Sequence, residues 1–293
     1  MPHRLLAFLL SLIALHAASQ PVVWTAPSLT RIAMDARPGT SDNVTIYAAK
    51  GESESFQIAV RGPSAIVNIV ATDFEKSGSK EKIEKSNVVL YREHSIRIPP
   101  ESASRCRYAY KPCTNPPLGA GTYPDALIPF HAPPNAPLVA VPFTVAADQN
   151  QPFWIDVHVP RNAAAGTYTA TFTIVTRQAP HAVIHATLIV WNFTLPLRPA
   201  LKSAFRARHT TRPFVEELLK HRLMPKDVNP ADLRDLIDQF GLNITSIPFW
   251  GMDDKDKDRL KEPPAVKDIE EEARKRKFDG LPLYCYPDRK SVV

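Results

Sequence analysis

Hydrophobic side chains occupy every second position in several short runs of the first two thirds of the chain. The clearest runs are Phe56–Val60, Phe153–Val159 and Tyr168–Ile174. Successive side chains of a β-strand point to opposite faces, so each run should bury one face and expose the other. Threonines fill the alternate positions of the third run, and β-branched side chains favour strands. The run Ala182–Phe193 is apolar at both parities, which predicts a central strand.

Turn-like segments punctuate these runs at 37–42, 76–79 and 161–166. The chain contains 29 prolines against 10 glycines, and proline is excluded from helix interiors and central strands. Such a sequence favours short antiparallel strands in a β-sandwich over a helical bundle. The proline-rich segment 99–142 interrupts the alternation and is predicted to be a long structured loop that packs across the sandwich.

The periodicity changes after Pro199, where segments with helical spacing alternate with short strand-like segments. Asn229 followed by Pro230 is typical of a helix start, and Gly241 is typical of a helix end. Alternating strands and helices predict parallel βα units. The expected helices are 212–223, 230–240 and 264–278, and the expected strands are 203–208, 243–250 and 281–286.

The expected fold class is therefore mainly β. An antiparallel β-sandwich is expected at 20–198, followed at 199–293 by an incomplete α/β segment that resembles part of a TIM barrel. About three βα units fit in this segment, whereas a closed barrel needs eight. The chain is accordingly expected to end before such a barrel is complete.

The N-terminus has the pattern of a signal peptide. A short charged start precedes the apolar run Leu5–Leu15 and the small residues Ala17–Ser19. A membrane-spanning helix needs about 20 apolar residues, so this run is too short to span. We expect a signal peptide at 1–19, cleaved after Ser19, and hence a secreted or periplasmic protein with no membrane span.

Charge and cysteine content narrow the functional classes. The formal charge is +6, but the basic residues are scattered among acids, which argues against nucleic acid as a partner.

Cys106 and Cys113 flank a short loop and can close a disulfide in an exported protein. The spacing does not give the geometry of the two thiols, so a disulfide and a pair of free thiols are both compatible with the sequence. The third cysteine, Cys285, has no evident partner. Neither a phosphate-binding loop nor a His-Glu-x-x-His motif occurs, so no cofactor and no metal are expected.

Five segments of the β-rich region form a recognisable set. They are Gly-Glu-Ser-Glu-Ser-Phe-Gln at 51–57, Tyr-Pro-Asp-Ala-Leu-Ile-Pro at 123–129, Gln-Pro-Phe-Trp-Ile-Asp-Val-His-Val-Pro at 151–160, Ala-Gly-Thr-Tyr-Thr at 165–169 and Trp-Asn-Phe-Thr-Leu-Pro at 191–196. In this order and spacing they resemble the glycoside hydrolase family 123-like proteins, including bacterial relatives with a C-terminal domain of unknown function (DUF4091). The resemblance covers roughly 24–290 and is strongest up to Pro196.

This resemblance implies an N-terminal sandwich joined to a (β/α)₈ barrel that hydrolyses N-acetylgalactosaminides by a substrate-assisted route. An adjacent Asp-Glu pair in the barrel would do the chemistry, with Asp holding the acetamido group and Glu acting as general acid/base. In this chain the weak catalytic candidate Asp288 is followed by Arg289, and a guanidinium cannot deliver a proton near neutral pH. The chain is therefore expected to lack glycosidase activity.

Three further side chains are candidates for a sugar subsite, because the C-terminal ends of barrel strands form the active face. Arg208 and His209 follow the first expected βα strand, and Trp250 ends the second. The alternative is that Trp250 packs under a loop and Arg208 makes a surface ion pair. Asp156 and His158 share the polar face of one strand, where a solvated surface is a simpler interpretation than a metal or acid–base site.

The resemblance implies that the partner is a glycan containing N-acetylhexosamine. The rival hypothesis is a stand-alone sandwich that binds glycans or cell-envelope polymers without chemistry. Exposed aromatic side chains on one sheet face would favour this rival.

Overall fold

The computed structural model describes residues 22–100, 119–177, 182–205, 211–226 and 228–246, together with a few positions between 265 and 284. The polypeptide divides into two compact units between Phe193 and Thr194, a few residues before the boundary expected from the sequence. Among the described residues, no helix has the length and apolarity needed to cross a membrane.

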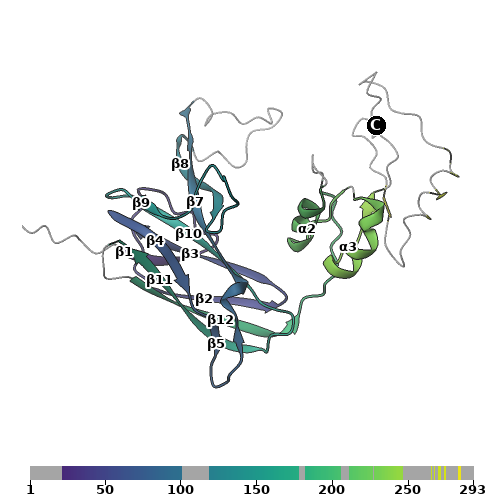
Figure 1. The fold of residues 1–293 in the computed structure, drawn as a ribbon, viewed down its shortest axis with the longest axis horizontal. Coiled ribbons are helices and arrows are strands. Elements are labelled where there is room, and N and C mark those ends of the chain that lie inside the picture. Colours follow the sequence, from purple (N-terminus) through teal and green to yellow (C-terminus); the bar gives the residue numbers. More distant parts are fainter. Residues whose placement is uncertain are drawn as a thin grey trace, which may run out of the picture. The chain divides into compact units, whose positions relative to one another are not determined.

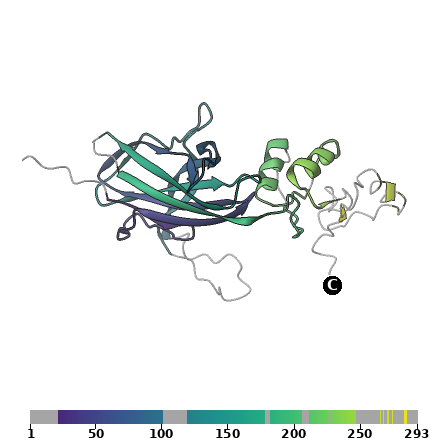
Figure 2. The same cartoon turned by 90° about the horizontal axis from the view of Figure 1, so that it is seen from below.

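Unit 1 is a sandwich of two β-sheets (Figure 1 and Figure 2), which confirms the mainly β prediction. The five-stranded sheet has the order β1-β3-β10-β7-β8, and its neighbouring strands are antiparallel. Its strands are β1 (Val22–Pro27), β3 (Ser53–Arg61), β10 (Asn150–His158), β7 (Val88–Ile98) and β8 (Gly121–Pro129).

The seven-stranded sheet has the order β2-β12-β11-β4-β9, with β5 beside β11 and β6 beside β5. Its strands are β2 (Asn43–Lys50), β12 (Ala182–Thr194), β11 (Gly166–Thr176), β4 (Ser64–Ala71), β9 (Phe143–Val145), β5 (Phe74–Lys76) and β6 (Lys82–Ile83), and the 3-10 helix η1 (Lys85–Asn87) precedes β7.

Strand β2 runs parallel to β12, which departs from the all-antiparallel expectation. The backbone N–H of His185 donates to the carbonyl of Asp42 at 2.9 Å. Further along, the ring centroids of Tyr47 and Trp191 are 6.3 Å apart. The residue numbers of both strands rise together from the first contact to the second, as parallel pairing requires.

The hydrophobic core of unit 1 lies between the two sheets. Phe56 of β3 and Phe172 of β11 meet edge to face with ring centroids 5.4 Å apart, and Phe74 of β5 lies 6.2 Å from Phe172. The alternation predicted for β10 and β11 is confirmed, because the inward positions of both strands are buried. These positions are Phe153, Ile155 and Val157 on β10, and Tyr168, Ala170, Phe172 and Ile174 on β11.

Strand β3 is buried on both faces, unlike the one-sided burial that its alternation predicted. Gln57, on its outward face, is 1% exposed, and its amide donates to the carbonyls of Pro27, Ser28 and Thr30. The segment that carries these carbonyls therefore lies over β3. It completes a small apolar cluster of Trp24, Ala26, Ile32 and Ala59.

The segment 99–142, predicted to be one long loop, contains strand β8. This strand pairs with β7 through a register shift between His94 and Ser95, and Pro124 lies opposite Ser95. Proline is tolerated here because β8 is the last strand of its sheet and because the irregularity removes the need for one ladder hydrogen bond. Phe130 follows β8 and packs on the core, with its ring 6.0 Å from that of Phe153.

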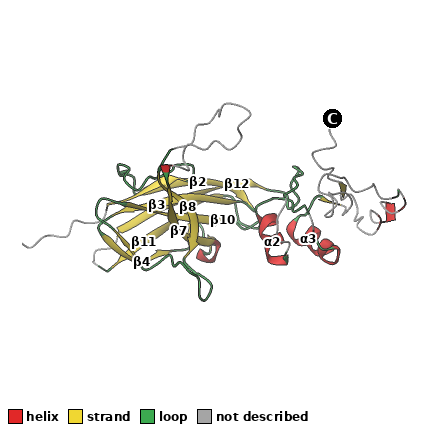
Figure 3. Ribbon diagram, turned by 90° about the horizontal axis from the view of Figure 1, so that it is seen from above, coloured by secondary structure: helices red, strands yellow, loops and turns green. Residues whose placement is uncertain are grey.

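Among its described residues, unit 2 has the α-helices α2 (Arg212–Lys220) and α3 (Leu233–Phe240), which lie side by side (Figure 3). Their buried positions recur at helical spacing, whereas Phe214 of α2 is 41% exposed. The buried residues are Val215, Leu218 and Leu219 of α2 and Leu233, Leu236 and Ile237 of α3.

Both ends of the second helical segment are as predicted. The side chain of Asn229 accepts the N–H of Ala231 at 3.1 Å and so caps the 3-10 turn η2 (Pro230–Asp232) that leads into α3. Gly241 ends α3 in the left-handed region with φ 73°. A Cβ at this position would lie 2.2 Å from the carbonyl oxygen of Leu197, so a side chain would meet both backbone strain and a clash.

The strands β13 (Thr245–Ser246) and β14 (Leu283–Tyr284) pair in parallel. They belong to the second and third strands expected after Pro199, and parallel pairing is what a βα unit produces. Glu270 and Arg274, inside the expected third helix, are helical, and their side chains approach to 3.9 Å. The described part of unit 2 thus shows a parallel pair but no barrel.

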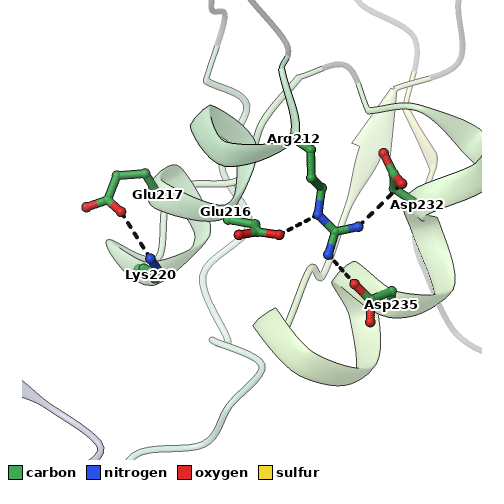
Figure 4. A network of polar contacts seen from close by, with 6 residues as sticks. All are labelled: Arg212, Glu216, Glu217, Lys220, Asp232 and Asp235. Atoms are coloured by element: carbon green, nitrogen blue, oxygen red, sulfur yellow. Dashed lines mark hydrogen bonds and ion pairs between the residues drawn. The ribbon is translucent and has the colours of Figure 1, made fainter. Parts of the chain in front are cut away.

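Arg212 ties α2 to the start of α3 (Figure 4). Its guanidinium contacts the carboxylates of Glu216 in α2, Asp232 in η2 and Asp235 in α3. The Nε–Oε1 distance to Glu216 is 2.6 Å, and the guanidinium lies 5.6 Å from the ring centroid of Phe240. The hydrogen bonds that Arg212 donates to the carboxylates of Asp235 and Glu216 raise the pKa of Arg212, so this side chain stays cationic.

Replacing Arg212 by Met is expected to lower the unfolding temperature of unit 2 by several degrees, because three carboxylates then face one another without their shared cation. Thermal unfolding followed by far-ultraviolet circular dichroism measures this effect. Lys220→Met is the control, since it removes an exposed pair with Glu217 whose side chains are 59% and 60% exposed. Equal unfolding temperatures for the two variants would contradict the role of Arg212.

Candidate functional site

Strand β12 is buried on one face only. It lies between β2 and β11, as predicted for a central strand. Its inward positions from Ile184 to Val190 are buried, but on the outward face Trp191 is 43% exposed and Phe193 is 51% exposed. Single exposed apolar side chains are common on protein surfaces, but a cluster of large ones often marks an interaction surface. This face is therefore the first candidate for a functional surface.

Three aromatic rings form a stack across β2 and β12. The ring of Trp191 lies 6.3 Å from that of Tyr47, with planes at 28°, and 5.6 Å from that of Phe193, with planes at 15°. Near-parallel rings at these distances are in the favourable offset arrangement. Tyr47 is 50% exposed. Mutual stacking restricts the rotation of each ring, so the three side chains form a pre-ordered apolar surface.

Threonine side chains continue this surface along all three strands. Thr45 is exposed and shares the outward parity of Tyr47 on β2. On β11, exposed Thr169 lies opposite Thr187 of β12, and exposed Thr167 lies opposite the next outward residue of that strand. The aromatic–threonine face is defined here as Tyr47, Trp191, Phe193, Thr45, Thr167, Thr169 and Thr187.

The aromatic–threonine face is nearly free of charge. Strands β11 and β12, of 11 and 13 residues, contain no Asp, Glu, Lys or Arg. Strand β2, of 8 residues, contains only Lys50, whose Nζ donates to Oδ1 of Asn192 at 3.3 Å. Glu75 of β5 lies opposite Thr169 and marks the rim. Since 23% of the whole chain is charged, this face is suited to apolar contact and hydrogen bonding rather than to ion pairing.

A polar cluster lies on the outer face of the other sheet. Trp154 Nε1 and Ser55 Oγ both donate to Oδ1 of Asp156, at 2.6 and 2.5 Å. Ser53 Oγ and His158 Nδ1 are 3.1 Å apart, and burial lowers the pKa of His158, so its ring is neutral near pH 7. The carboxylate of Asp156 thus accepts hydrogen bonds from Trp154 and Ser55, whereas His158 contacts Ser53. These contacts do not join Asp156 and His158 into an acid–base pair. Within the described residues, no group of three metal-ligating side chains occurs.

Two neighbouring charged side chains of β7 are buried on opposite faces of the sheet. Arg92 is 5% exposed, donates to the carbonyl of Val139 at 3.1 Å and lies 4.2 Å from the ring centroid of Phe143. Glu93 is 7% exposed, and its Oε1 has no hydrogen-bond partner in the part of the chain that the structure describes. Burial raises the pKa of Glu93 to about 7. These two groups do not converge on one site, but Glu93 makes the stability of unit 1 sensitive to pH.

The site residues predicted from the sequence lie outside the described residues and stay predictions. They are the subsite candidates Arg208, His209 and Trp250, the weak catalytic candidate Asp288, and the disulfide candidates Cys106 and Cys113.

The three rings of the aromatic–threonine face were not predicted as site residues. A signal was present, because Trp191 and Phe193 have the parity opposite to the inward row that begins at Ile184. A strand that is apolar at both parities does not reveal whether anything covers its second face.

Residues 33–176 match the glycoside hydrolase 123 N-terminal domain. A search of curated proteins found no significant match. Among solved structures, the fold is similar to that of a family 123 glycoside hydrolase from Clostridium perfringens, described for glycolipid glycan hydrolysis, with 12% identity and a TM-score of 0.51. The match covers 77% of this chain and 37% of that enzyme, so this chain spans well under half of the enzyme's length. At this identity the likeness shows the fold alone.

Other solved structures match much less well. A PapD-like domain of human CEP192 has 11% identity and a TM-score of 0.25, covering 65% of this chain and 98% of that one. A structure of the AAF fimbriae of enteroaggregative Escherichia coli has 11% identity and a TM-score of 0.25, covering 59% and 100%. These scores are too low to carry an argument.

Proposed function

We propose that this chain, whose residues 33–176 match the glycoside hydrolase 123 N-terminal domain, provides the non-catalytic N-terminal module of a secreted glycoside hydrolase-like protein that acts on glycans containing N-acetylhexosamine. The observation that carries the proposal is the match over residues 33–176 to that domain. The similar fold of the Clostridium perfringens enzyme supports it. The apolar run Leu5–Leu15 supports export.

We place the chemistry outside residues 1–293. The family resemblance implies an adjacent Asp-Glu pair for substrate-assisted hydrolysis of N-acetylgalactosaminides, and no Asp-Glu dipeptide occurs in this sequence. Asp288 is followed by Arg289, which lacks a transferable proton near neutral pH. A glycosidase active site also needs groups held within about 0.5 Å by a supporting shell, and the part of unit 2 that the structure describes has one parallel strand pair rather than such a shell.

A second role, glycan binding by the sandwich itself, is favoured by a specific observation. The sequence alone was compatible with this rival hypothesis, and exposed aromatic side chains on one sheet face were the feature expected to favour it. Tyr47, Trp191 and Phe193 have this arrangement on the outward face of β2 and β12. The two roles are compatible, because a module without catalytic groups can still hold a substrate chain.

The purified mature chain, expected to be residues 20–293, should show no turnover of a chromogenic N-acetylgalactosaminide. The assay is run beside an active N-acetylgalactosaminidase, with circular dichroism to show that the polypeptide is folded. Asp288→Asn is the matched variant, since it removes the one candidate carboxylate with little change in shape. Turnover by the wild type that Asp288→Asn abolishes would show that the chain is an enzyme and that the proposal is wrong.

A further inference from the structure

We infer that the aromatic–threonine face binds an uncharged glycan chain, laid across strands β2, β12 and β11. The inference deepens the proposed function, because it names the surface and the chemical class of the ligand. It rests on the exposed rings, on the threonine hydroxyls beside them and on the scarcity of charge, because Lys50 of β2 is the one Asp, Glu, Lys or Arg in the three strands.

The rings supply the apolar part of such a site. A sugar ring presents C–H groups on its faces and hydroxyls around its edge, so it needs an apolar surface next to hydrogen-bonding groups. Trp191 and Phe193 are 43% and 51% exposed and already stacked. Because stacking has restricted their rotation before a ligand arrives, little side-chain entropy is lost on binding.

The threonines supply the polar part of the site. Each hydroxyl both donates and accepts a hydrogen bond, which matches the hydroxyls of a sugar. Thr167 and Thr169 lie two residues apart on the outward face of β11, and Thr187 lies opposite Thr169 across the strand pair. A row of short hydroxyl side chains along the strand presents repeated hydrogen-bonding positions, as a chain of similar sugar units requires.

Charge and composition favour a neutral glycan over other occupants. Strands β11 and β12 contain no Asp, Glu, Lys or Arg, and Lys50 of β2 already donates to Asn192, so an anionic membrane surface or an anionic polymer finds few ion-pair partners there. Protein interfaces draw most of their binding energy from Trp, Tyr and Arg, with Thr under-represented, whereas four of the seven residues that define this face are threonines. A protein partner, including a second copy of this chain, is therefore the alternative for the experiment to exclude.

The experiment is a calorimetric titration of the mature chain, residues 20–293, with a neutral oligosaccharide of β-linked N-acetylglucosamine. The de-N-acetylated form of the same oligosaccharide, which is cationic, is titrated in parallel. The neutral form should bind, and Trp191→Ala and Phe193→Ala should each weaken its binding about tenfold. Thr169→Val keeps the side-chain shape but removes the hydroxyl, and should weaken binding about threefold.

Phe214→Ala is the matched control for Phe193→Ala. Phe214 is 41% exposed on α2 of the other unit, so its replacement removes a comparably exposed ring outside the proposed site and should leave the affinity unchanged. Circular dichroism of each variant checks that folding is retained. If Trp191→Ala does not fold, Phe193→Ala and Thr169→Val still test the proposal.

Three results would overturn the inference. One is the absence of binding to the neutral oligosaccharide, and another is binding that the ring variants leave unchanged. The third is self-association of the wild type without saccharide that Trp191→Ala abolishes in sedimentation, since the face would then join copies of the chain. Each of these results leaves the non-catalytic role intact, whereas turnover in the hydrolysis assay would refute that role and not the binding.

Discussion

Phe172→Ala is expected to destabilise the β-sandwich by about 4 kcal/mol, the range found when a buried Phe is truncated to Ala. Phe172 is fully buried on β11 and makes edge contacts with Phe56 of the opposite sheet and Phe74 of β5. Its loss leaves a cavity where the two sheets meet. Since a domain is usually stable by about 5–15 kcal/mol, this one substitution removes a large share of the stability of unit 1.

Phe193→Ala is the matched control for this prediction. It makes the same chemical change in the same sheet, but at a side chain that is 51% exposed, so its cost should stay within about 0.5 kcal/mol. Urea denaturation followed by circular dichroism gives both free energies of unfolding. Equal losses for Phe172→Ala and Phe193→Ala would show that the interface between the sheets is not the stabilising core.

Glu93→Gln is expected to remove a loss of stability that the wild type suffers as the pH rises. Burial raises the pKa of Glu93 from its ordinary 4.5 to about 7 in the folded chain. Below about pH 4.5 the carboxyl is neutral in both the folded and unfolded states and costs nothing. Between about pH 4.5 and 7 only the unfolded state ionises, so stability falls. Above about pH 7 the full cost is reached, about 3 kcal/mol.

The measured quantity is the change in unfolding free energy between pH 4.5 and pH 8. Wild type should lose about 3 kcal/mol more than Glu93→Gln over this interval. A Gln amide at this position also needs partners, but its cost does not depend on pH, so the difference between the two pH values isolates ionisation. Glu75→Gln, at an exposed position of β5, should behave like wild type. A Glu93→Gln variant with the wild-type pH dependence would show that Glu93 is solvated in the folded state.

Local patterns predicted the strands and helices that are stabilised by near neighbours. The period of two placed Ile155 and Phe172 inward, and burial confirms both. The cap at Asn229 and the left-handed end at Gly241 were predicted because each depends on groups within a few residues. Strand β8 was missed because prolines count against strands, and only the order of the sheet shows that β8 lies at an edge.

The sequence by itself determined which side chains of each strand share a face, because alternation is a property of the extended backbone. Only the tertiary structure decided which faces are covered, because covering elements come from distant parts of the chain. The outward face of β3 is covered by the segment that Gln57 holds, whereas Trp191 and Phe193 stay exposed on β12. The ionisation of Glu93 follows the same rule, since its pKa depends on what surrounds it in space. The candidate glycan-binding surface could therefore be identified only once burial was known.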